Sequence, residues 1–290
     1  MSARLLFVHA LSPVHAGTGA SIDAVDLPIA RERSTGIPYL PGSGLKGSLR
    51  DKCRGLASDK VTAIFGPETA NASDHAGAVI FGDATLLALP VRSLHGTFAW
   101  VTSPYLLARF RRDAKEAGLE VPALKGPTSI GTALVTADTA LTVAGINKVF
   151  IDDLDFAPQP ANELKEVAGR IVGWALGLKD ADAAEYVKRF VVVSDDAMSF
   201  LCQHATQVVT RVSLDEATKT VKQGQLWTEE LLPTESLLYA LIAPTAGLRN
   251  GPTAEDTLKT LTLLTASNTQ LGGKATVGRG RCQLRLAGGR

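Results

Sequence analysis

The chain has 290 residues, of which 45% are hydrophobic and 20% are charged, and its 30 basic and 29 acidic side chains leave a net charge of +1. This composition is typical of a folded globular protein with a substantial core, and it excludes a disordered chain. The balanced charge excludes binding of polyanions through total charge, so any such binding must depend on local clusters of cations.

The first part of the chain predicts a strand, a long loop and a helix. Residues 3–11 form an apolar run that predicts a strand, whereas residues 11–41 are interrupted by Gly and Pro and follow neither the helical nor the strand period. Ser43 is expected to cap a helix that ends at about Arg54. Residues 76–89 predict a second strand.

The remaining elements alternate between helices and strands. Residues 101–118 predict a helix with a basic surface, and residues 162–178 predict an amphipathic helix. In residues 205–230, β-branched side chains flank the turn-like sequence LDEATKT, which predicts a projecting hairpin with few groups to bury. A capping box formed by Thr253 and Asp256 predicts a last helix, followed by a glycine-rich loop and a strand. This order predicts a mixed α/β protein with long functional insertions.

The cysteines and the apolar segments indicate the cellular compartment of the protein. The three cysteines are too few and too far apart for a disulfide framework or a CxxC zinc site: Cys53, Cys202 and Cys282. The apolar patch at the N-terminus is too short for a signal peptide, and no apolar run approaches the length of a membrane span. We therefore expect a cytoplasmic protein with no membrane partner.

Two groups of cations could bind an anion. One is the row Lys46, Arg50 and Arg54, at four-residue spacing on the first predicted helix. Charged outer faces of helices are common, so this row alone is weak evidence.

The second group is the segment from Gly272 to Arg290, which contains five basic residues, including Lys274 and Arg279, and no acidic residue. Its glycines could let main-chain N–H groups and nearby cations hold phosphates, although the order is not that of a Walker A loop. The alternative is a solvated basic tail after a helix cap. The glycines are Gly272, Gly273, Gly278 and Gly280.

Four blocks of sequence resemble the signature blocks of the RAMP superfamily, and they occur in the family's order between residues 9 and 282. More narrowly, they resemble the repeated backbone subunit, the fourth Cmr subunit, of the type III-B CRISPR RNA-guided effector. The block around Arg92 to Pro104 is the most discriminating, because many RAMP proteins share the glycine loop. One departure is Ser103, where the family often has Cys, and we expect it to change only packing. The blocks are HAGTGASIDAVDLPIARERSTGIPYLPGSGLKGSLR, PVRSLHGTFAWVTSP, GQLWTEELLP and GGKATVGRGRC.

This resemblance implies a single domain over residues 1–290, with an RRM-like (ferredoxin-like) core, inserted lid segments and a thumb at about 205–228. It implies a subunit that binds guide RNA along its length and cleaves complementary target RNA at regular intervals, beside other copies of itself and other Cmr subunits. The two groups of cations would then hold guide phosphates. The thumb would wedge between bases of the guide–target duplex and displace a nucleotide.

The resemblance also implies a catalytic site. Asp26 matches the family's catalytic carboxylate. An ordinary Asp, with a pKa of about 3.9, is a poor base at neutral pH, so Asp26 is expected to position a divalent metal, Mg²⁺, or a 2′-hydroxyl. His15 is a candidate acid, base or RNA contact. The alternative is that it is only a hydrogen-bonded surface residue. Glu229 and Glu230 are candidate second carboxylates of the site. The alternative is that they are a pair of solvated surface side chains. Nothing in the family's pattern selects Asp23.

Two alternatives remain open on the sequence. The chain could be a non-catalytic RNA-binding filament subunit, which differs from the nuclease in lacking a functional Asp26. It could also be a stand-alone phosphate-binding metabolic enzyme that uses the glycine loop, although no nucleotide-binding fingerprint is present.

Overall fold

The computed structural model describes residues 3–19, 21, 24–53, 55, 57–68, 70, 74–143, 145–245 and 251–289, so Asp23, Arg54 and Arg290 lie outside the described residues. Its helices are α1 (Gly42–Asp51), α2 (Ser58–Phe65), α3 (Pro104–Glu116), α4 (Asn162–Leu176), α5 (Asp180–Val187), α6 (Asp195–His204) and α7 (Ala254–Thr265). Its strands are β1 (Arg4–Ala10), β2 (Tyr39–Leu40), β3 (Val79–Phe81), β4 (Ala84–Arg92), β5 (Phe98–Thr102), β6 (Thr132–Val135), β7 (Val149–Ile151), β8 (Leu154–Pro160), β9 (Phe190–Val192), β10 (Gln207–Leu214), β11 (Val221–Leu231), β12 (Leu237–Pro244), β13 (Thr269–Gln270) and β14 (Arg281–Ala287).

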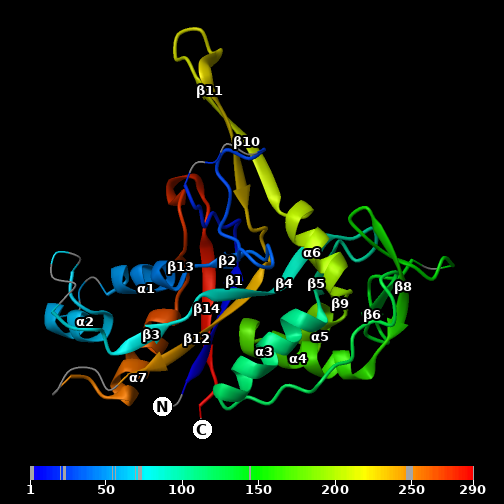
Figure 1. Cartoon of the computed structure of the whole chain (residues 1–290), viewed down its shortest axis with the longest axis horizontal. Coiled ribbons are helices and arrows are strands. Elements are labelled where there is room, and N and C mark those ends of the chain that lie inside the picture. The colour runs from blue at the N-terminus through cyan, green and yellow to red at the C-terminus, as the bar shows by residue number, and fades with distance from the viewer. Residues whose placement is uncertain are drawn as a thin grey trace.

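One large mixed sheet organises the molecule (Figure 1). Its strand order is β13-β14-β1-β12-β4-β5-β9-β6-β8-β7, with β2 added to β4 and β3 to β12. Around β1 the pairing is antiparallel: β1 pairs with β12 and β14, and β12 pairs with β4. The predicted mixed α/β class is therefore confirmed.

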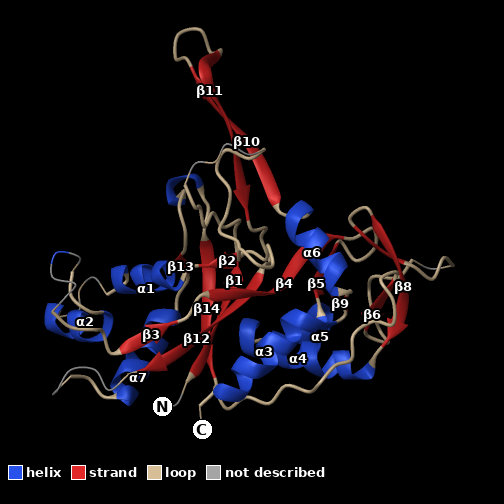
Figure 2. Ribbon diagram, in the orientation of Figure 1, coloured by secondary structure: helices blue, strands red, loops and turns tan. Residues whose placement is uncertain are grey.

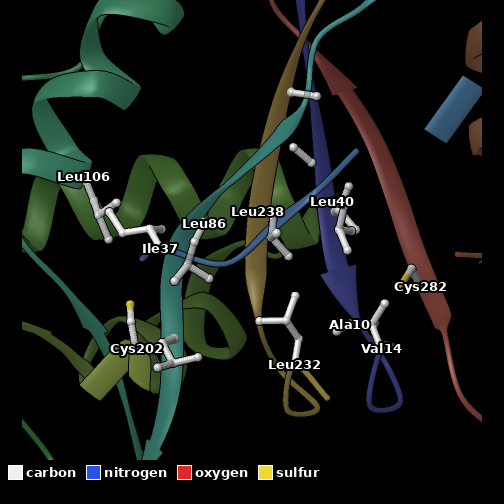
Figure 3. Close-up of a cluster of buried hydrophobic side chains, with 14 of the residues drawn as sticks. Ala10, Val14, Ile37, Leu40, Leu86, Leu106, Cys202, Leu232, Leu238 and Cys282 are labelled. Carbon is white, nitrogen blue, oxygen red and sulfur yellow. The ribbon is translucent and has the colours of Figure 1, made fainter. Parts of the chain in front are cut away.

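The sheet is buried on both faces, which explains why β1 is apolar at consecutive positions. Side chains alternate between the faces of a strand, so Leu6 and Val8 enter one core while Leu5 and Phe7 enter the other. Helices α1, α2, α6 and α7 cover the first core, and α3, α4 and α5 cover the second. Figure 3 shows part of the first core, where side chains of β4, β12 and the segments beside them meet.

The first helix begins differently from the prediction. Ser43 is not its cap: the helix starts at Gly42, after Pro41, and no side chain caps it. Instead, the Gly42 N–H donates to the Asp83 carboxylate at 2.7 Å. A Cβ at Gly42 would lie 2.5 Å from the Phe81 carbonyl oxygen, so the helix starts against the turn that divides the predicted strand of residues 76–89 into β3 and β4. Packing against that turn, rather than a serine, sets the first residue.

Other predicted elements are confirmed. Helix α4 matches residues 162–178, and α7 begins with the predicted capping box, in which Thr253 and Asp256 exchange hydrogen bonds. Helix α3 occupies most of the predicted helix of residues 101–118, but residues 101–102 belong to β5. The helix starts after Ser103, whose Oγ accepts from the Leu106 N–H at 3.4 Å. Ser103 therefore caps a helix, a role beyond the predicted change in packing.

The hairpin β10-β11 projects from the body of the molecule, as predicted (Figure 2). At its tip, the Asp215 carboxylate accepts from the N–H groups of Ala217 and Thr218, both at 3.0 Å, and so fixes the turn. Along the hairpin, the apolar side chains of Val208, Val212, Leu214, Val221 and Leu226 are exposed. Helices that could cross a membrane are absent from the described part of the chain.

Candidate functional site at the base of the hairpin

The long loop of residues 11–41 joins the root of the hairpin to the glycine loop, residues 272–280. Val14 pairs with Leu232 just beyond β11, and His15 pairs with Gly273. Leu27 lies parallel to Glu229: its N–H donates to the Thr228 carbonyl at 3.1 Å, and its carbonyl accepts from the Glu230 N–H at 3.0 Å. Three segments that are far apart in the sequence therefore meet at one place.

Asp26 lies at the exposed edge of this junction. Its Oδ2 accepts from the Thr228 N–H at 2.7 Å and from the Thr228 hydroxyl at 2.8 Å. In return, the Asp26 N–H donates to Thr228 Oγ1 at 3.0 Å. The hydrogen bonds from the Thr228 backbone and side chain hold the pKa of Asp26 below its ordinary value. Asp26 is therefore an ionised, solvent-accessible carboxylate with a fixed orientation.

Glu229 is buried, with only 1% of its surface exposed, so the solvated-pair alternative is wrong for this residue. Its Oε1 lies 3.0 Å from Lys274 Nζ and accepts from Trp227 Nε1 at 2.9 Å. Burial acts to raise the pKa of Glu229, but the donors of Trp227 and Lys274 outweigh it, and the pKa lies below the usual value. Oε2 is buried with no hydrogen-bond partner among the described residues.

Glu230 is buried as well, and both of its carboxylate oxygens are occupied. Oε1 accepts from Arg31 at 2.5 Å and from the Thr206 hydroxyl at 2.7 Å, while Oε2 accepts from the Ile29 N–H at 3.1 Å. The solvated-pair alternative is therefore wrong here too. These contacts fasten the long loop to the hairpin root, which is a structural task.

His15 is buried at 7% exposure, so it is not the surface histidine of the alternative reading. Its Nδ1 lies 2.8 Å from the Glu230 carbonyl oxygen, and its own carbonyl accepts from the Gly273 N–H at 2.9 Å. A Cβ at Gly17 would lie 2.5 Å from His15 Nε2, so a glycine there leaves room for the ring. His15 packs between the hairpin root and the glycine loop.

The glycine loop does not offer the free main-chain donors that we expected. The N–H groups of Gly273, Gly278, Arg279 and Gly280 donate to carbonyls of His15, Ala275, Lys274 and Pro13, respectively. Gly272 and Gly280 have positive φ, and a Cβ on either would overlap a carbonyl oxygen, of His15 and Leu271, respectively. These two glycines thus permit close packing within the chain, whereas Gly278 has open space where a Cβ would lie. A phosphate cradle of amides, on which the metabolic-enzyme alternative depended, is not formed by these four donors.

The cations of α1 have separate tasks. Lys46 is half-buried and lines a hollow of about 810 Å³, together with residues such as Ser43 and His75. Arg50 does not point freely outward, because its guanidinium donates to the carbonyls of Gly66 and Pro67 at 2.9 and 3.0 Å. Lys52, which the sequence pattern did not single out, donates to carbonyls at the end of α7, including that of Ser267 at 2.8 Å.

The described residues contain no group of three or more His, Cys, Asp or Glu side chains that could hold a metal ion. Asp26 Oδ2 is already engaged by two donors from Thr228. The described side chains therefore do not form a complete protein site for a divalent ion.

The structure thus brings together Asp26, His15, Glu229, Glu230 and Lys274 at the hairpin root. The C-terminal end of α1 is joined to the start of β13, just before the glycine loop, because Lys52 Nζ donates to Thr269 Oγ1 at 3.0 Å. Sequence reasoning missed Thr228, Trp227 and Arg31, which hold the carboxylates. The block GQLWTEELLP contains the first two. Trp227 lies two residues from its partner Glu229, whereas Thr228 lies 202 residues from its partner Asp26.

Comparisons with known proteins identify the family of this chain. The model of the RAMP superfamily matches residues 7–283. The chain is 35% identical over 296 residues to "CRISPR system Cmr endoribonuclease Cmr4" of Pyrococcus furiosus, covering 99% of this chain and 96% of the relative. It is 24% identical to "CRISPR system CMR subunit Cmr4" of Saccharolobus solfataricus, covering 96% and 94% of the two chains.

A solved structure, "Crystal structure of oligomeric Cmr4 from Pyrococcus furiosus", has a TM-score of 0.77 and 29% identity, covering 99% of both chains. The fold also resembles a chain in "Cryo-EM structure of the Type III-B Cmr-beta bound to cognate target RNA", with a TM-score of 0.73, 19% identity and coverage of 98% and 96%. The match to the family model and the relative of 35% identity both extend over nearly the whole chain. This protein therefore belongs to the RAMP superfamily, and within it to the Cmr4 family.

Proposed function

We propose that this chain is the repeated backbone subunit of a type III-B CRISPR effector, and that it binds guide RNA and cleaves the complementary target RNA. The observation that carries the nuclease assignment is Asp26, an oriented and accessible carboxylate at the root of a projecting hairpin. Of the three described candidate carboxylates there, Glu229 and Glu230 are buried. The relative from Pyrococcus furiosus is named an endoribonuclease, which supports the same reaction.

We infer that β1, α1, β4, β12, α7 and β14 form a ferredoxin-like core. In the sheet, these strands stand in the order β14-β1-β12-β4, and each is antiparallel to its neighbour. Numbered along the chain, this order is fourth, first, third and second. Both helices pack on the same core. This order supports the assignment. The hairpin is then the thumb, inserted between α6 and β12 of a single domain.

Guide RNA would be held mainly by side chains. Arg50 already binds two carbonyls, and the glycine-loop amides have partners within the chain. We therefore favour Lys46, which lines the hollow beside α1, and Lys274, whose side chain is 35% exposed although it pairs with Glu229. Phosphate contacts of this kind fix position without reading sequence. Other copies of this chain would continue the row of cations along the guide, beside other Cmr subunits.

Cleavage would proceed through the target RNA's own 2′-hydroxyl. Its oxygen attacks the adjacent phosphorus, the bond to the 5′-oxygen breaks, and a 2′,3′-cyclic phosphate forms; the 2′-hydroxyl loses a proton and the leaving oxygen gains one. The exposed apolar side chains of the thumb, such as Leu214 and Leu226, would displace a nucleotide so that the attacking oxygen reaches the in-line position. Asp26 would accept the 2′-hydroxyl hydrogen bond and orient that oxygen.

The expected Mg²⁺ stays a prediction. The described side chains do not form a complete site for it, and no step above depends on it. Cleavage of target RNA in magnesium and in chelator tests the requirement directly.

The test of the proposed function is Asp26→Asn in assembled complexes with matched guide and target occupancy. Because the carboxylate is removed while the thumb is unchanged, regularly spaced cuts ending in a cyclic phosphate should fall at least ~100-fold, as is typical when a positioned catalytic group is lost. An Asp23→Asn variant serves as the control and should cut normally. Cleavage by Asp26→Asn at the wild-type rate would replace this proposal with the non-catalytic filament subunit.

A further inference from the structure

We propose that Thr228 is a positioning residue for cleavage: its hydroxyl fixes the orientation of the Asp26 carboxylate against the root of the thumb. This inference rests on the proposed function, in which Asp26 contacts the target 2′-hydroxyl. Thr228 lies on the thumb itself. The element that displaces the nucleotide would therefore also orient the Asp26 carboxylate.

The Thr228 hydroxyl is used twice. It donates to Asp26 Oδ2 at 2.8 Å and accepts from the Asp26 N–H at 3.0 Å, while the Thr228 N–H donates to the same Oδ2 at 2.7 Å. One oxygen of the carboxylate thus receives two hydrogen bonds, and the main chain of Asp26 is held by the same side chain. A hydroxyl donates and accepts through a single atom, whereas valine, with nearly the same shape, can do neither.

The surrounding contacts limit what else can move. Leu27 pairs with the main chain of β11, and Ile29 and Arg31 are both bound by the buried Glu230 carboxylate. The main chain that follows Asp26 is therefore anchored by groups other than the Thr228 side chain. Removing the hydroxyl should leave Asp26 Oδ2 with the Thr228 N–H as its one remaining donor from Thr228, so the carboxylate loses its fixed orientation while the loop stays docked. The expected defect is in orientation rather than in folding or binding.

The experiment compares Thr228→Val with Thr228→Ser in assembled complexes that contain guide RNA. Single-turnover cleavage is measured over a range of target concentrations, which separates the maximal rate from target affinity. Thr228→Val should cut roughly 10-fold more slowly at saturating target, since a hydrogen bond to a charged group is lost. Target affinity should stay within about 2-fold, because no contact to RNA is assigned to the hydroxyl. Thr228→Ser should recover most of the wild-type rate.

Thr210→Val is the matched control, because Thr210 lies directly opposite Thr228 on β10 and is exposed. It should cut at the wild-type rate. Unfolding midpoints of all variants are compared, and Thr228→Ala, which also lacks the hydroxyl, is used if valine lowers the midpoint.

The outcomes distinguish failure of this proposal from failure of the proposed function. If Asp26→Asn is inactive but Thr228→Val and Thr228→Ala cut at the wild-type rate, the positioning role is wrong and the catalytic assignment stands. If Asp26→Asn cuts normally, the proposed function fails. In either case, the carboxyl-carbon NMR signal of Asp26 in the isolated chain should differ between wild type and Thr228→Val. An unchanged signal would overturn the contact itself.

Discussion

Glu229 and Lys274 form an ion pair at the hairpin root. Glu229 belongs to the thumb and is almost completely buried, whereas Lys274 belongs to the glycine loop and has a side chain that is 35% exposed. A buried carboxylate is costly unless it is paired, and the ammonium group and the Trp227 N–H provide that pairing. The same ammonium group is the proposed phosphate contact, and it is already paired with Glu229. Guide RNA and Glu229 therefore compete for one cation.

Glu229→Gln should consequently strengthen RNA binding. The neutral amide releases part of the attraction on Lys274, so the isolated chain should bind single-stranded RNA about 2- to 5-fold more tightly at low salt, a change on the scale of one weak ion pair. If Glu229 is a second catalytic carboxylate, assembled complexes should also cleave more slowly. Filter binding and cleavage assays measure the two effects.

The control for this prediction is Glu185→Gln, which alters an exposed carboxylate paired with Lys188 on α5. It should change neither property. Weaker RNA binding by Glu229→Gln would show that the ion pair orders Lys274 for RNA instead of withholding it.

The thumb is an element whose outer part has little to bury. Residues 222–226 of β11 are exposed, and β10 alternates between half-buried and exposed positions until its last residue, Leu214. Only the root, from about Glu229 onward, enters the body of the protein. A two-stranded hairpin without a packed face is marginally stable in water. The outer thumb is therefore expected to be mobile in the free protein and ordered by RNA.

Replacing residues 214–220 with a short Gly/Ser turn should leave the fold intact, because these side chains contribute almost nothing to either core. The unfolding midpoint should change by no more than a few degrees, while target cleavage in assembled complexes should fall strongly because the nucleotide is no longer displaced. Hydrogen exchange should already be fast in this segment of the wild-type protein without RNA. Loss of folding in the variant would mean that the tip is part of the core.

The molecule as a whole combines a nearly neutral charge with local cations, which suits a subunit that must pack against copies of itself on RNA. Lys46 lies on α1 and Lys274 on the glycine loop, and Lys52 joins the end of α1 to β13, just before that loop. Each phosphate contact releases counterions, so binding must weaken as salt increases. Uniform positive charge would instead make neighbouring copies repel each other.

The isolated chain should therefore bind single-stranded RNA with a steep decline in log affinity against log salt and with little sequence preference. Lys46→Ala and Lys274→Ala should each reduce the slope by about 0.7, the value for one contact to a single strand. Lys165→Ala, on α4 at the other face of the sheet, is the control and should leave the slope unchanged. Affinity that does not depend on salt, or a strong preference among unrelated RNAs, would contradict this account.

Much of this protein could be predicted from local sequence, because the responsible forces act over a few residues. Residues close together in the sequence account for the apolar run of β1, the capping box of Thr253 and the turn at Asp215. The blocks that resemble the RAMP superfamily were also readable, and the family is confirmed over nearly the whole chain. Asp26 was selected through that resemblance, and its catalytic role stays a prediction.

What required the tertiary structure was the environment of each candidate side chain. Asp26 is oriented by Thr228 and Glu229 is paired with Lys274, although the partners are separated by 202 and 45 residues in the sequence. The same is true of the glycine loop, whose amides looked free in the sequence but are bound within the chain. Burial and hydrogen bonding depend on which distant segments pack together. The spacing of residues within one segment does not predict that packing.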